Sequence, residues 1–259
     1  MKSYIDAAAL KKHNLLNESI ARYSVRATLA GIFLTFGSAI GFMLSENFNG
    51  IDPAIGKFLY AAFFPWGLIF IIFLNGELAT SNMMYLSNAA HRKTLTWSQA
   101  FKVLLFCTLF NFVGSVILSF ALSKTAIFSN VTPDHYMFHS VHTKITKPVW
   151  LALMDGILAN ILVNVAIIGT VRLKEETSKI VYILGTIFIF AYFGFEHVIA
   201  NFGSFTLAYF VNPVAFPELT ISNMLVNWVA AFVGNFIGGG LIMGIVYSWL
   251  NQSETEYLD

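Results

Sequence analysis

The sequence predicts an all-α membrane protein with six transmembrane helices. Of its 259 residues, 57% are hydrophobic and only 11% are charged, whereas a soluble domain usually carries about 25% charged residues. A helix needs about 20 apolar residues to cross a bilayer. Six stretches approach or exceed that length: 27–44, 58–74, 103–123, 148–171, 180–195 and 219–250.

The second and fifth spans are expected to be broken helices. The second contains Pro65 and runs into the polar stretch 75–82, and the fifth meets Glu196-His197 before apolar residues resume. A break inside a bilayer frees backbone N–H and C=O groups, which is tolerated only if the break is buried in protein or lines a cavity. Both breaks are therefore predicted to border a central path.

The two halves of the chain repeat each other. Asn82 follows Glu77 by five residues, and Asn201 follows Glu196 by five residues. The third and sixth spans share an Asn-Phe-Val/Ile-Gly motif, at 111–114 and 235–238. Each half has three spans, so the second half must be inverted, a design that places the substrate path near the repeat interface. We expect one transmembrane channel domain over residues 1–259, with repeats at about 20–124 and 145–252.

The distribution of positive charge predicts that both termini are cytoplasmic. Six spans put the two termini on the same side of the membrane. Cytoplasmic loops carry an excess of Lys and Arg, and of the 15 such residues only Lys57, Lys124, Lys144 and Lys147 fall on the opposite side. The net charge of +1 gives no sign of nucleic-acid binding.

The acidic residues at the breaks have two interpretations. Glu77 and Glu196 could carry protons, or each carboxylate could accept hydrogen bonds at the break with Asn82 or Asn201 beside it. We favour the second, because the two are placed symmetrically. Asp155 is the single acid of the fourth span, and the sequence assigns it no role.

The histidines divide into one candidate site residue and a group of loop residues. His197 is the only histidine in an apolar span. Elsewhere a lone buried histidine is usually a hydrogen-bonded structural residue, but ionisable residues inside a membrane are functional by default. His135, His139 and His142 fall in a polar loop, where solvation is a better explanation than a metal site. No metal or cofactor is expected.

At the breaks the sequence resembles the formate/nitrite transporter family, most closely its hydrosulfide channel branch. The resemblance rests on Gly-Glu-Leu-Ala-Thr at 76–80, Gly-Phe-Glu-His-Val-Ile-Ala-Asn at 194–201 and Gly-Ile-Leu-Ala-Asn at 156–160. It implies an aquaporin-like protomer in a homopentamer of the bacterial inner membrane, with one pore per protomer. Ala79 stands where formate-type members carry phenylalanine, which favours hydrosulfide.

The resemblance also implies roles for individual residues. Thr80 and His197 would meet in the centre of the pore, and Asn160 would brace a broken helix. The implied constrictions pair Phe64 with Leu68 on the outer side and Leu78 with Phe190 on the inner side. Lys144 would attract anions at the outer mouth, although it and Lys147 could also simply extend to the membrane interface.

The predicted function is passage of small monovalent weak-acid anions, with hydrosulfide favoured and formate or nitrite also possible. His197 would either hydrogen-bond the anion in a channel or take part in proton-coupled transport. The alternative is an aquaporin-like channel for neutral solutes, although twin Asn-Pro-Ala motifs are absent. An intramembrane enzyme is not expected, because neither His-Glu-x-x-His nor Gly-x-Ser-x-Gly occurs.

Overall fold

The computed structural model describes residues 2–250 and is helical throughout apart from short connections. Six of its helical segments are long and apolar enough to cross a membrane, which confirms the six predicted spans. They are Ile20–Phe48, Pro53–Phe73, Trp97–Ser123, Val149–Arg172, Glu176–Phe193 and Ile221–Leu250. The shorter apolar helix Val198–Val211 completes the fifth.

The elements follow one another in the same order in each half of the chain. The first half contains α1 (Lys2–Glu18), α2 (Ile20–Asn49), α3 (Pro53–Phe63), α4 (Trp66–Phe73), α5 (Ala79–His91) and α6 (Trp97–Ser123). The second contains α7 (Tyr136–Ile145), α8 (Val149–Arg172), α9 (Glu176–Phe193), α10 (Val198–Val211), α11 (Ile221–Asn235), the π-helix η1 (Phe236–Val246) and α12 (Tyr247–Leu250).

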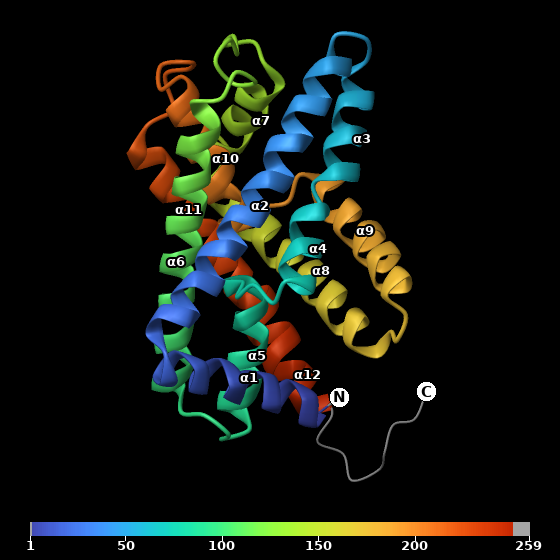
Figure 1. Cartoon of the computed structure of the whole chain (residues 1–259), viewed down its shortest axis with the longest axis vertical. Coiled ribbons are helices and arrows are strands. Elements are labelled where there is room, and N and C mark those ends of the chain that lie inside the picture. Colours follow the sequence, from blue (N-terminus) through green and yellow to red (C-terminus); the bar gives the residue numbers. More distant parts are fainter. Residues whose placement is uncertain (1, 251–259) are drawn as a thin grey trace.

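The two ends of the molecule carry different elements (Figure 1). Helices α1, α5 and α12 lie together at one end, here called the α1 end. Helix α7 and the turn between α2 and α3 lie at the other, here called the α7 end. The expected repeat limits remain predictions, and residues 251–252 of the second repeat lie outside the described part of the chain.

Both predicted breaks are present, and both begin with a left-handed residue. After α4 the chain leaves the helix at Asn75, with φ of 54°, and re-enters one at Ala79. After α9 it leaves at Gly194, with φ of 71°, and re-enters one at Val198. Glycine adopts this conformation without the steric penalty of a Cβ. Pro65 adds a second interruption between α3 and α4, since proline lacks the N–H that a helix interior uses.

Helices α1 and α7 were not predicted, because both are too polar or too short to resemble a span. In α1, the buried residues Ile5, Ala9 and Leu16 lie on one face, a spacing typical of an amphipathic helix. That face packs on α5, and an ion pair of 2.8 Å joins Asp6 to Arg92 at the end of α5. In each half of the chain a short helix therefore precedes the first span.

The repeated glycines of the third and sixth spans allow close helix contacts. A Cβ on Gly114 in α6 would lie 1.9 Å from the backbone oxygen of Thr28 in α2. A Cβ on Gly238 in η1 would lie 2.1 Å from the backbone oxygen of Ile157 in α8. At both positions the neighbouring backbone is so close that only glycine fits. The repeated motif thus encodes the same helix packing twice.

Substituting these glycines tests that packing. Gly114→Ala and Gly238→Ala should each lower stability by about 1–3 kcal/mol, because the added methyl group forces two backbones apart. Gly185→Ala is the matched control, since a Cβ there has no atom within 4 Å and alanine is the better helix former. Thermal unfolding in detergent measures all three. Equal melting temperatures for the Gly114 variant and the control would contradict the close contact.

Candidate functional site

Asn111 in α6 supplies the backbone partners that the first break needs. Its Oδ1 accepts a hydrogen bond of 2.9 Å from the N–H of Ala79, the first residue of α5. Its Nδ2 donates to the carbonyl oxygens of Glu77 at 2.8 Å and of Ala27 in α2 at 2.7 Å. One amide side chain thus satisfies both sides of the break and ties it to α2.

Asn235 in α11 does the same at the second break, atom for atom. Its Oδ1 accepts from the N–H of Val198, the first residue of α10, at 2.9 Å. Its Nδ2 donates to the carbonyl oxygens of Glu196 at 2.9 Å and of Gly156 in α8 at 2.8 Å. The repeated motif had marked both asparagines as equivalent, but their role becomes visible only from these contacts.

The carboxylate of Glu77 is enclosed by polar groups of the first half. Lys12 in α1 donates to Oε2 at 2.8 Å, and Asn82 donates to the same oxygen at 3.1 Å. The Asn82 amide also donates to the hydroxyl oxygen of Tyr23 at 3.1 Å and to Sγ of Cys107 at 3.4 Å. Glu77 is therefore held by an ion pair and an amide rather than left free.

The carboxylate of Glu196 has a matching environment in the second half. Asn201 donates to its Oε2 at 2.6 Å and to Oδ1 of Asn227 at 2.8 Å. The Nζ of Lys147 lies 2.6 Å from its Oε1 and the Nζ of Lys144 lies 3.2 Å from it. The Glu-Asn spacing of five residues thus gives the same carboxylate–amide contact in both breaks.

Thr80 and His197 meet at the centre of the molecule. Each stands at the start of a half-helix, and their Oγ1 and Nε2 atoms are 2.8 Å apart. His197 is the N-cap of α10, where its Nδ1 accepts from the N–H of Ala200 at 3.2 Å. Both side chains are buried. The contact joins the two halves of the chain through a single hydrogen bond.

Asn160 in α8 holds the segment that carries Thr80. Its Nδ2 donates to the carbonyl oxygen of Thr80 at 3.1 Å and to that of Asn235 at 2.7 Å. Asn164, one turn further along α8, donates in turn to the Asn160 carbonyl at 2.8 Å. Asn160 therefore links the start of α5 to the sixth span.

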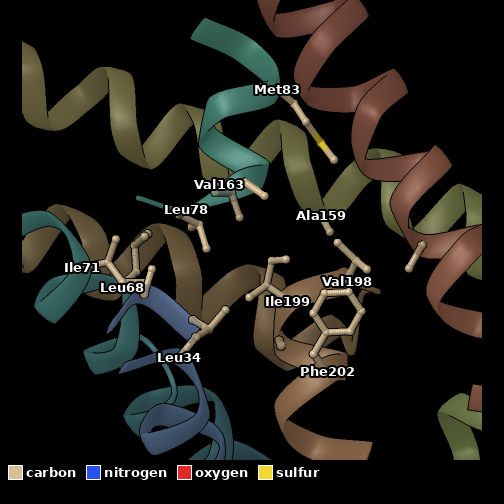
Figure 2. Close-up of a cluster of buried hydrophobic side chains, with 14 of the residues drawn as sticks. Leu34, Leu68, Ile71, Leu78, Met83, Ala159, Val163, Val198, Ile199 and Phe202 are labelled. Atoms are coloured by element: carbon tan, nitrogen blue, oxygen red, sulfur yellow. The ribbon is translucent and has the colours of Figure 1, made fainter. Parts of the chain in front are cut away.

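Next to His197 lies a very small apolar cavity. It has a volume of about 10 Å³, which is about the space of one water molecule. Figure 2 shows part of its apolar surroundings, with side chains of α2, α4 and α8 gathered beside the break that precedes α5. The lining residues are Leu34, Phe64, Leu68, Leu78, Val163, Ile187, Phe190 and His197.

All four residues expected to form constrictions line the central cavity. The rings of Phe64 and Phe190 are in contact, with centroids 5.5 Å apart. These two also line a second cavity of about 20 Å³ towards Lys144, which Leu68 and Leu78 do not reach. Phe64 and Phe190 therefore lie between the central cavity and Lys144. The expected pairing of Phe64 with Leu68 and of Leu78 with Phe190 stays a prediction.

A wide cavity with charged residues in its lining opens at the α1 end. It has a volume of about 690 Å³ and lies between α1 and the first break. The basic residues Lys11, Lys12 and Arg26 line it together with the acidic residues Glu18 and Glu77. The sequence did not predict this vestibule, because its inner wall is the unpredicted helix α1.

The expected polar loop with three histidines is instead helical, with His135 at the start of α7 and His139 and His142 within it. His135 caps α7 by accepting from the N–H of Met137 at 3.0 Å, and His142 lies 3.5 Å from the carboxylate of Glu218. Across residues 2–250, no group of three or more His, Cys, Asp and Glu side chains is arranged to hold a metal ion.

Comparison with known proteins finds one family. The family model described as Formate/nitrite transporter matches residues 2–249. The chain is 30% identical over 90% of its length to Nitrite transporter NirC of Salmonella typhimurium, of which it covers 84%. A solved FNT family ion channel has a similar fold, with a TM-score of 0.89 at 24% identity, covering 96% of this chain and 98% of that one. A pentameric formate channel with formate bound has a TM-score of 0.79 at 25% identity, covering 88% and 96%.

The two bracing asparagines give a paired prediction. Asn111→Leu and Asn235→Leu each leave two backbone carbonyls and one N–H without a partner, at about 1–3 kcal/mol per buried group. Both should lower the melting temperature in detergent strongly and by similar amounts. Asn223→Leu, on the partly exposed surface of α11, is the control. A bracing variant as stable as the control would show that the break does not depend on that amide.

Proposed function

This chain belongs to the formate/nitrite transporter family, and we propose that it passes small monovalent weak-acid anions through a pore in each protomer. The observation that carries the proposal is the Thr80–His197 hydrogen bond beside an otherwise apolar cavity. The aromatic pair Phe64 and Phe190 separates that cavity from Lys144. A charged group in an apolar membrane interior is costly, so an anion needs hydrogen-bond donors at this point.

The hydrogen bonds of His197 indicate which donors are available. Nδ1 accepts from the Ala200 N–H, so the neutral ring carries its proton on Nε2. That N–H donates to Thr80 Oγ1, which leaves the hydrogen of the Thr80 hydroxyl free to point at an anion. His197 thereby orients the Thr80 hydroxyl as a donor. An anion can accept from this hydroxyl without breaking the Thr80–His197 hydrogen bond.

The same geometry favours hydrogen bonding over proton transfer. A doubly protonated His197 would lose the cap to Ala200, because Nδ1 could no longer accept. No carboxylate contacts the ring among the described residues, and Glu77 and Glu196 are each paired with lysine. We therefore propose that these glutamates support the breaks, and that His197 acts by hydrogen bonding in a channel.

Orientation, assembly and substrate complete the proposal. The excess of basic residues at the α1 end supports a cytoplasmic α1 end, with Lys144 on the outer side. The solved pentameric relative supports a homopentamer. Formate and nitrite are supported by the names of relatives. Hydrosulfide is favoured because Ala79, the first residue of α5, is small where formate-type members of the family carry phenylalanine.

A flux panel tests this function. Purified protein in liposomes should pass hydrosulfide, formate and nitrite well above empty liposomes, and chloride flux in the same vesicles shows whether passage is limited to anions of weak acids. Glycerol swelling in the same vesicles tests the neutral-solute alternative. Glycerol passage without anion flux would overturn the proposal, and loss of hydrosulfide flux alone would overturn only the substrate preference.

The central pair can be tested separately. His197→Asn and Thr80→Val should each reduce anion flux by about tenfold to a hundredfold, since each removes a buried hydrogen-bond partner. Asparagine is itself a good N-cap, so the first variant should stay folded. Thr108→Val is the matched control, because its hydroxyl only bonds back to Leu104 within α6. Wild-type flux in both central variants would show that the pair does not contact the anion.

A further inference from the structure

Four charged side chains meet where the second break faces the α7 end. We call Lys144, Lys147, Asp155 and Glu196 the charge quartet. Lys147 bridges the two acids, with Nζ 2.6 Å from Asp155 Oδ2 and 2.6 Å from Glu196 Oε1. Lys144 lies further from Glu196, at 3.2 Å. When all four groups are ionised, two positive and two negative charges cancel.

The two lysines have different partners. Lys147 directs its shortest contacts at carboxylates. Lys144 instead donates to the neutral carbonyl oxygens of Gly194 at 3.2 Å and Phe195 at 3.0 Å, at the end of α9. Only Lys144 lines the small cavity outside the aromatic pair. The lysine that faces the path is thus the one whose charge is less closely matched by an acid.

The titration of the two lysines agrees with this difference. Burial lowers the pKa of Lys144 below its usual value, and the pull of Glu196 in the other direction does not overcome it. Burial also acts on Lys147, but the carboxylates of Glu196 and Asp155 raise its pKa above the usual value. These directions agree with the contacts, in which Lys147 lies closer than Lys144 to the carboxylates.

The first repeat shows that Asp155 is not needed to build a break. Asn111 bonds the carbonyl of Ala27 and Asn235 bonds that of Gly156, so Arg26 and Asp155 occupy equivalent positions. Arg26 itself donates to the carbonyl of Asn75 at 2.9 Å. In the first repeat Arg26 bonds the break directly. In the second repeat the equivalent residue, Asp155, pairs with a separate cation, Lys147.

We propose that Lys147 and Asp155 are positioning residues that set the electrostatic potential for an anion arriving at Lys144. Lys147 neutralises Glu196, so that the charge of Lys144 remains available to the anion. Asp155 fixes Lys147 in place and limits the positive potential of the quartet. This role rests on the proposed anion passage, and it concerns entry from the α7 end rather than the central pair.

Charge-changing variants separate this role from a merely structural one. Lys147→Met leaves the quartet at −1 and should raise the apparent KM for formate by about threefold or more, while Asp155→Asn leaves it at +1 and should lower the KM. The double variant, neutral again, should fall between them. Flux into liposomes at low ionic strength gives the KM values, and the differences should shrink as salt is added. Some protein molecules insert into the liposomes in the opposite orientation. They make the measured changes in KM smaller but do not reverse their direction.

A structural ion pair would give a different pattern. Both single variants would then lower flux and stability together, because each breaks the same Lys147–Asp155 contact, and this same-direction result would overturn the proposal. If Lys147→Met does not fold, Asp155→Asn decides alone, since an unchanged or higher KM contradicts the inference. A wild-type protein that passes no anion above empty liposomes would instead overturn the proposed function itself.

Discussion

The fold depends on satisfying backbone groups that two helix breaks expose inside a bilayer. Lipid offers no hydrogen bonds, so each break must find its partners within the protein. Asn111 and Asn235 provide them, each by accepting from the start of a half-helix and donating to two carbonyls. The glycine three residues after each asparagine lets its helix come close enough to make these contacts.

The carboxylates of Glu77 and Glu196 are tolerated at the breaks because each has a lysine close by. Lys12 reaches Glu77 from α1, and Lys147 reaches Glu196 from the segment after α7. The short helices ahead of each repeat thus deliver a cation to the corresponding break. The resulting path has charged ends and an apolar middle, where the Thr80–His197 hydrogen bond is one of the polar contacts between the two halves.

Much of this could be predicted from the sequence, because apolar length and repeated motifs are local signals. The six spans, both breaks and the inverted halves follow from them, His197 stood out as the only histidine in a span, and the family resemblance added its pairing with Thr80. The contact of Phe64 with Phe190 depends on where α9 ends in space, which no local pattern records. Likewise, the ion pair between Asp155 and Lys147 forms because the chain turns at Pro148. The sequence alone did not show this contact.

The bracing contacts have a consequence for the order of assembly during translation. All the partners described for the first break come from residues before 112, and those of the second come from residues after 143. The first half can therefore close its break before the ribosome has made the second. Asn160 and His197 each bond Thr80 across the two halves, so the contacts at the pore centre require both halves to have been made.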